Sequence, residues 1–387
     1  MRISFSNFRA LKKKRFRIWC GCMGAIALLC ILFSTKTFAR TPPTEPTRIQ
    51  VQQSRELYEA GRFSEAARLL EQSIQLYRQR NDPLNLAMSL SNLAILQYHL
   101  GDWQAANAAI AESLSILERH PNASVLAQTL DVRGQLQLAQ GQTELALNTW
   151  QASEAIYVQL RDSLGTARSR INQAHALRVL GFYKRAINTL MALRKTLQSQ
   201  PDSAMKAIAL RSLGNALERS GKAQEAEQFL QESLTIAQHL QDPEQISSAL
   251  LGLGNLSRLK QSPQTAIDYY QQAAKQAPRE TIRVQAQLNL FALLIELQQR
   301  STAKQLVAPL QQSLSNLSPS RATFDAQINF AQSLAKLDAQ SFEQSARLLS
   351  RVAQQAQNLR DQRIESYAYG VLAELYEQQQ RWAEAQR

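Results

Sequence analysis

Residues 83–119 read PLNLAMSLSNLAILQYHLGDWQAANAAIAESLSILER, with a helical pattern on either side of a Gly-Asp pair. Apolar residues at helical spacing predict a helix over 86–100. This helix is expected to end at Gly101, because glycine tolerates the left-handed conformation that follows many helices. Asp102 can cap a second helix from Trp103 to about Arg119. The stretch therefore predicts a helical hairpin.

The same pattern recurs every 40 residues. Four columns keep this interval: a small residue, a glycine, an alanine and a large apolar residue. The columns are Ser54, Ala94, Gly134, Ala174, Gly214 and Gly254; Gly61, Gly101, Gly141, Gly181 and Gly221; Ala66, Ala106, Ala146, Ala186, Ala226 and Ala266; and Leu70, Ile110, Trp150, Leu190, Leu230 and Tyr270. Because one hairpin cannot bury its apolar face alone, the interval predicts an array of stacked hairpins.

The order of the columns resembles the tetratricopeptide (TPR) repeat, whose units are shorter at about 34 residues. The resemblance covers about residues 47–387. It implies an all-α fold, a right-handed superhelical solenoid of about eight and a half hairpins. Later units depart from the pattern, since Gln298 stands where glycine is expected. The ninth unit stops at Arg387, early in its second helix, so the chain is expected to be truncated.

The amino terminus predicts an export signal. Eight basic and no acidic residues lie within residues 1–39, an uncharged apolar run covers 18–35, and Ala39 fits a cleavage site. An uncleaved membrane anchor is the alternative, because the run just reaches the length that spans a bilayer. Both interpretations place the rest outside the cytoplasmic membrane, with membrane contact only through 18–35 if uncleaved. The predicted organisation is a signal or anchor at 1–39, a Pro-rich linker at 40–50 and the array at 51–387.

Composition argues against most kinds of chemistry. The net charge of +13 falls to +5 once residues 1–39 are set aside, which predicts no nucleic-acid partner. All three cysteines lie within the first 30 residues, so the array lacks a cysteine nucleophile and a disulfide. The four histidines lack metal-ligand spacing, and no glycine-rich phosphate loop occurs. We therefore expect no catalytic residue, no cofactor and no metal.

A narrower resemblance is to the front half of cyanobacterial CHAT-domain proteins. It rests on the export segment, the 40-residue period and four short segments: SLGN at 212–215, LGNL at 253–256, LSPSRA at 317–322 and DQRIESYA at 361–368. In that family a caspase-like domain with a His and a Cys follows the repeats. Because residues 40–387 contain no cysteine, the resemblance implies a missing partner domain and transfers no catalytic residue.

The TPR resemblance also implies where a ligand binds. In that family the first helix of each hairpin lines a concave groove, and some members hold a peptide carboxylate with a basic residue and an Asn one turn apart. Arg211 and Asn215 have that spacing, whereas Leu251 replaces the base expected in the next unit. The predicted groove residues are Arg168, His175, Arg178, Arg211, Asn215, Arg219, Asn255 and Arg258. We expect a mildly basic groove that takes acidic or C-terminal peptide segments.

The sequence thus predicts a non-catalytic protein- or peptide-binding scaffold, exported or membrane-anchored, that forms the recognition arm of a larger CHAT-type protein. The alternative is a regulatory or substrate-docking segment of a caspase-like peptidase whose catalytic domain lies beyond Arg387. A third possibility, a cytoplasmic sensor, requires that residues 1–39 are not an export signal.

Overall fold

The structure is a computed structural model that describes residues 45–317, 319–358 and 361–381. The chain divides into two units, residues 1–30 and 31–387, and all that follows concerns the second. The export segment predicted at 1–39 and the residues after 381 lie outside the described ranges. Within those ranges, no helix combines the length and apolar character needed to cross a membrane.

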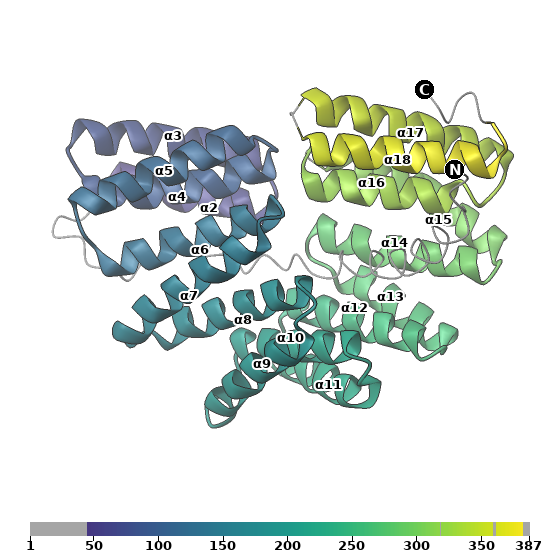
Figure 1. The fold of residues 1–387 in the computed structure, drawn as a ribbon, viewed down its shortest axis with the longest axis horizontal. Helices are drawn as coiled ribbons and strands as arrows, with labels where there is room; N and C mark the ends of the chain where they lie inside the picture. Colours follow the sequence, from purple (N-terminus) through teal and green to yellow (C-terminus); the bar gives the residue numbers. More distant parts are fainter. Residues whose placement is uncertain (1–44, 318, 359–360, 382–387) are drawn as a thin grey trace, which may run out of the picture. The chain divides into compact units, whose positions relative to one another are not determined.

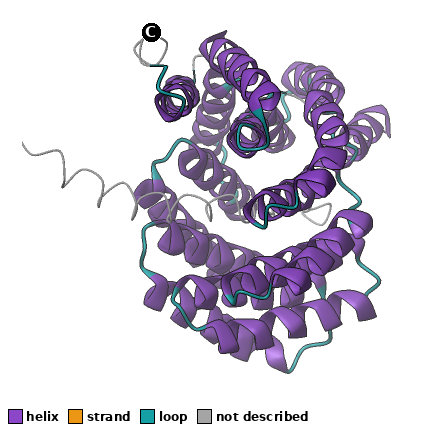
Figure 2. Cartoon of the chain, turned by 90° about the vertical axis from the view of Figure 1, so that its right-hand side faces the viewer, coloured by secondary structure: helices purple, strands orange, loops and turns teal. Residues whose placement is uncertain are grey.

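The described residues form helices and contain no strand, as Figures 1 and 2 show, so the all-α prediction is confirmed. Successive helices pair into hairpins, from α2–α3 to α16–α17, and α18 opens a further unit. The helices are α2 (Glu45–Glu59), α3 (Phe63–Gln79), α4 (Pro83–His99), α5 (Trp103–Arg119), α6 (Ala123–Ala139), α7 (Thr143–Gln159), α8 (Ser163–Val179), α9 (Tyr183–Gln198), α10 (Ala204–Arg219), α11 (Ala223–His239), α12 (Pro243–Leu259), α13 (Pro263–Gln276), α14 (Glu280–Glu296), α15 (Arg300–Asn316), α16 (Arg321–Leu334), α17 (Ala339–Asn358) and α18 (Gln362–Gln378).

Helix α2 begins at Glu45, inside the stretch predicted to be a Pro-rich linker. Pro46 is the second residue of this helix, where a missing backbone N–H costs nothing because the first turn has no partner for it.

The turn between the two helices of a hairpin follows the glycine column. Gly101 has a φ of +80°, and the side chain of Asp102 accepts a hydrogen bond of 2.9 Å from the Ala105 N–H. Both roles predicted for this pair are confirmed. Where the column lacks glycine, Gln261 and Gln298 adopt the same left-handed backbone, with φ of +58° and +59°. The turn thus persists through later units without its preferred residue.

The small and large columns fit into one another. A Cβ atom added at Gly134 would lie 2.5 Å from the Trp150 ring, and one added at Gly254 would lie 2.5 Å from the Tyr270 ring. Each ring belongs to the second helix of the same hairpin as its glycine. The small column therefore lets the two helices of a hairpin approach closely.

The side chain of Arg321 joins hairpins that are far apart in the sequence. Its guanidinium donates to the backbone oxygen of Ala139 and lies 5.1 Å from the Trp103 ring centroid. It also forms a 2.9 Å ion pair with Asp361, the residue that caps α18. One half-buried side chain thus connects the α5–α6 region with the start of α18.

Candidate binding surface on the first helices of the hairpins

The eight predicted groove residues lie on three neighbouring first helices. Arg168, His175 and Arg178 lie on α8, Arg211, Asn215 and Arg219 on α10, and Asn255 and Arg258 on α12. Seven of them are half-buried, and Arg211 is buried. Whether a ligand contacts any of them stays a prediction, so their contacts within the chain decide which are available.

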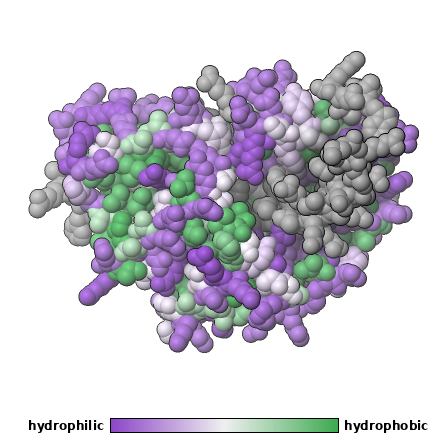
Figure 3. All heavy atoms as spheres, viewed as in Figure 1, coloured by the Kyte–Doolittle hydropathy of each residue, from purple (hydrophilic) through white to green (hydrophobic). Residues whose placement is uncertain are grey.

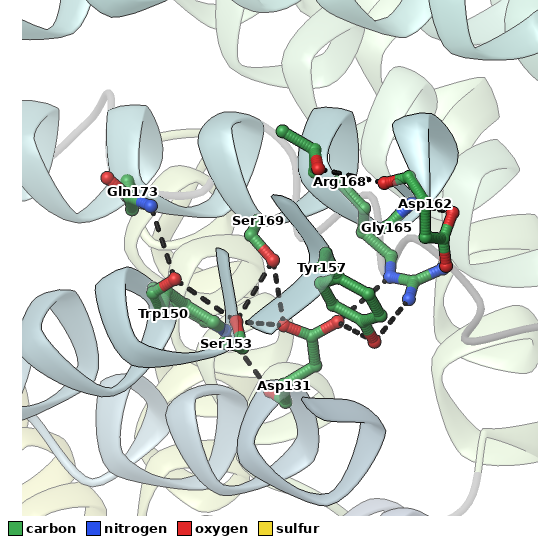
Figure 4. A network of polar contacts seen from close by, with 10 residues as sticks. Asp131, Trp150, Ser153, Tyr157, Asp162, Gly165, Arg168, Ser169 and Gln173 are labelled. Atoms are coloured by element: carbon green, nitrogen blue, oxygen red, sulfur yellow. Dashed lines mark hydrogen bonds and ion pairs between the residues drawn. The ribbon is translucent and has the colours of Figure 1, made fainter. Parts of the chain in front are cut away.

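The Arg168 side chain forms contacts within the array. Figure 4 shows its guanidinium beside the buried carboxylate of Asp131, at 3.0 Å, and it also donates to the Tyr157 hydroxyl at 2.8 Å. Tyr157, Ser153 and Ser169 donate to the same carboxylate, over 3.0, 2.7 and 3.1 Å. Arg168 therefore has an internal partner from α6, which the sequence analysis did not foresee.

Asp131 is the residue that the sequence analysis missed. It is completely buried, and its backbone oxygen accepts a hydrogen bond of 3.1 Å from the Trp150 indole. Burial raises the pKa of the Asp131 carboxyl, while Arg168 and the hydroxyl donors oppose the rise. The available signal was its position in the repeat, because Asp131 lies 40 residues from Ser91 and Ile171. An acidic residue in that column requires a buried partner.

The two predicted groove residues on α12, Asn255 and Arg258, also form contacts within the array. The Asn255 side-chain oxygen accepts from the Tyr270 hydroxyl and from the Asn289 amide, each at 2.9 Å. The Arg258 guanidinium pairs with Glu296 on the next first helix, α14. These contacts tie neighbouring hairpins together, which weakens the case for Arg258 as a ligand-binding residue.

Arg211 differs from the other arginines. Only 3% of the residue is exposed, and its Nε has no hydrogen-bond partner. Burial lowers the pKa of the guanidinium to about 10; Glu244 opposes the shift and Arg178 adds to it. Glu244 itself forms a 3.0 Å ion pair with Arg279. Arg211 is thus a buried cation whose charge is poorly compensated, which is costly unless an anion approaches it.

Two further groups, one on α8 and one on α10, have pKa values that burial shifts. Burial lowers the pKa of His175 to about 3, with Arg178 adding to the effect, so this imidazole is neutral near neutral pH. Burial raises the pKa of Glu218, while Arg219 and Arg178 oppose the rise. Glu218 therefore lies close enough to Arg219 and Arg178 to offset part of their positive charge.

The positive charge of the array is concentrated around these helices. Residues 166–222 contain eleven basic and two acidic side chains, while the whole of 40–387 has a net charge of only +5. The excess of positive charge is therefore local and not spread evenly along the array. A count within each unit would have shown this.

Within the described ranges, no three His, Cys, Asp or Glu side chains gather as metal ligands would. On the face drawn in Figure 3, hydrophobic side chains gather between hydrophilic ones. The predicted groove residues are arginines, one histidine and two asparagines, and arginine and amide side chains can bind anions and peptide groups.

Comparisons with known proteins agree with an array of helical repeats. Residues 165–239 and 205–279 match the family model described as tetratricopeptide repeat, and residues 54–137 match that of anaphase-promoting complex subunit 5. The matches and the fold support a TPR protein. No protein of curated function matches the sequence.

Solved structures share the fold at low identity. A Rap protein complexed with competence and sporulation factor is similar at a TM-score of 0.56 and 14% identity, over 89% of this chain and 100% of that chain. The apo quorum sensor NprR from B. thuringiensis is similar at a TM-score of 0.52 and 14% identity, over 88% and 96%. Aspartyl phosphate phosphatase F from Bacillus subtilis is similar at 0.51 and 11%, over 90% and 93%. At these identities the likeness concerns the fold.

Proposed function

We propose that this chain is a non-enzymatic scaffold that binds an acidic or C-terminal peptide segment on its first helices, with Arg211 as the principal anion-binding residue. The observation that carries the proposal is the buried guanidinium whose Nε lacks a partner. A carboxylate that reached Arg211 would supply the missing charge and accept more than one hydrogen bond. Asn215, one turn along α10, lies on the same face and supplies an amide.

The shared fold gives this proposal a precedent. The Rap protein of the similar structure was solved in complex with competence and sporulation factor, so a solenoid of this kind accommodates a bound factor. TPR arrays bind through side chains that vary from one protein to another, and the scaffold columns carry no information on the ligand. The support for a carboxylate therefore comes from Arg211 and the surrounding excess of positive charge.

The experiment compares two labelled peptide pools that differ only in a free or an amidated carboxyl terminus. We expect the full chain to prefer the free carboxylate, and the double variant Arg211→Ala, Asn215→Ala to lose that preference by about tenfold or more in Kd. Arg258→Ala is the control, because Glu296 already pairs with that guanidinium. Unchanged capture by the double variant would refute the carboxylate preference.

The wider role is a second part of the proposal. We infer from the basic and apolar pattern of residues 1–39 that the array works outside the cytoplasmic membrane, exported or anchored, as the recognition arm of a larger CHAT-type protein. Fusing residues 1–45 to a reporter that is active only in the periplasm tests the export step. An active reporter agrees with this role, and a silent one favours a cytoplasmic sensor.

A further inference from the structure

Helix α9 carries the largest excess of positive charge among the second helices of the hairpins within the described ranges. Its sequence YKRAINTLMALRKTLQ contains four basic and no acidic residues. The second helices on either side carry acids, such as Glu144 on α7 and Glu225 on α11. One face of α9 packs into the array through Ala186, Leu190, Leu193 and Leu197. The charge therefore lies on the other faces.

Three of the four basic side chains are exposed and lack an acidic partner among the described residues. Arg194 lies 5.1 Å from the Phe229 ring and 3.8 Å from Glu232, so it serves the contact with α11. Lys184, Arg185 and Lys195 are exposed, and none of them forms an ion pair with another described residue. These three cations face outward without a counterion from this part of the chain.

The exposed residues of α9 form a stripe with the spacing of a helix-packing face. Lys184, Asn188, Met191 and Lys195 follow one another at intervals of four, three and four residues, so they line one side of the helix. Met191 is 42% exposed, which is high for a large apolar side chain. The two lysines are about 16 Å apart along the axis, and Met191 lies between them.

The side chains beside this stripe suit contact with a helix of another protein. Ala192 is exposed next to Met191, and a small side chain allows close approach of a partner backbone. Phe182 is 48% exposed at the start of α9, and the Arg185 guanidinium lies 5.5 Å from its ring. An apolar centre between positive ends fits an amphipathic helix with an apolar stripe and acidic flanks.

We propose that the outer face of α9 is a docking surface for an acidic amphipathic helix of a partner protein. This surface is separate from the first-helix site around Arg211, which lies on α10. A lipid surface fits less well, since stable adsorption takes on the order of four to eight clustered basic residues and α9 exposes three. The partner needs carboxylates near both ends of the stripe and an apolar side chain against Met191.

The test uses the full chain and a fluorescein-labelled amphipathic helix peptide made of glutamate, leucine and alanine, at low salt. We expect the triple variant Lys184→Gln, Arg185→Gln, Lys195→Gln to weaken binding about tenfold, since each exposed ion pair is worth a few-fold. Met191→Gln should weaken it by a further few-fold. These positions are exposed, so circular dichroism should show the helical content unchanged.

The control removes the same charge elsewhere. Arg300→Gln, Arg347→Gln and Arg351→Gln alter exposed positions on α15 and α17 and should leave peptide binding unchanged. Equal loss in the control would show that only net charge matters, and equal binding by the α9 variant would also overturn the proposal. So would binding to phosphatidylglycerol vesicles, or to a DNA duplex, that depends on the same three residues. Arg211→Met should leave this binding unchanged, which separates it from the carboxylate site.

Discussion

At the scale of single residues, backbone conformation explains the most regular feature of the sequence. The glycine of each hairpin turn adopts a positive φ, and a Cβ atom added at Gly181 would meet nothing within 4 Å. Its requirement for glycine is therefore conformational. Gln261 adopts the same left-handed conformation, which is less favourable for a residue with a Cβ atom.

This contrast gives a pair of opposite predictions. Gly181→Ala should lower the free energy of unfolding by about 1 to 2 kcal/mol, because the Cβ atom of alanine makes the left-handed conformation unfavourable. Gln261→Gly should raise it by about 0.5 to 1 kcal/mol, since the penalty is relieved and part of the gain is lost to chain entropy. Urea unfolding of both variants measures the two changes. Equal signs would contradict the conformational explanation.

His175 predicts a loss of stability in acid. Its pKa in the folded chain is about 3, below the value of about 6.5 expected when unfolded, so the unfolded state binds the proton first as the pH falls. The free energy of unfolding therefore falls as the pH is lowered from about 6.5 to about 3, because protonation of His175 favours the unfolded chain.

Between about pH 7 and pH 4.5, His175→Gln should lose about 2 to 3 kcal/mol less stability than the unaltered chain. Urea unfolding at the two pH values measures the difference, with His120→Gln, an exposed histidine, as the control. Parallel losses in the His175 variant and the unaltered chain would contradict an imidazole that stays neutral in the folded chain.

At the scale of helices, the 40-residue interval predicts the elements because each column has one local role. The helix predicted from Trp103 to about Arg119 is α5 as observed, and the turn before it follows from Gly101 and Asp102. These features depend on residues a few positions apart. The Asp131–Arg168 pair depends on two hairpins meeting, which the spacing of residues along the chain does not reveal.

The close fit between the helices of a hairpin gives a matched pair of substitutions. Gly254→Ala should lower the free energy of unfolding by about 1 to 3 kcal/mol, because its Cβ would lie 2.5 Å from the Tyr270 ring. Gly370→Ala, in α18 with nothing within 4 Å, should raise it by about 0.5 to 1 kcal/mol through helix propensity alone. Thermal unfolding of the two variants distinguishes packing from propensity. A neutral Gly254→Ala would refute the packing role of the small column.

At the scale of the whole array, stability depends mostly on contacts between neighbours, and Arg321 is an exception. It connects Trp103 and Ala139 with Asp361, which lies far along the chain. No repeat column predicts this contact, because it depends on how the array curves. Sequence alone therefore predicts the units, but not the points where distant units meet.

Arg321→Ala should lower the free energy of unfolding by about 2 to 4 kcal/mol, because it leaves the buried Asp361 carboxylate unpaired. Backbone amides near Ala139 and at the start of α18 should exchange faster in the same variant. Arg300→Ala, at an exposed position, is the control and should change little. Faster exchange at only one of the two places would contradict a direct link between them.

The central claim is that Arg211 is kept buried and poorly compensated in order to bind an anionic peptide group. The most direct measurement is the stability and the peptide affinity of one variant, Arg211→Met, which keeps the side-chain bulk and removes the charge. We predict that its free energy of unfolding rises by about 1 to 3 kcal/mol while its preference for free-carboxylate peptides disappears. A variant that is less stable, or that retains the preference, would contradict the claim.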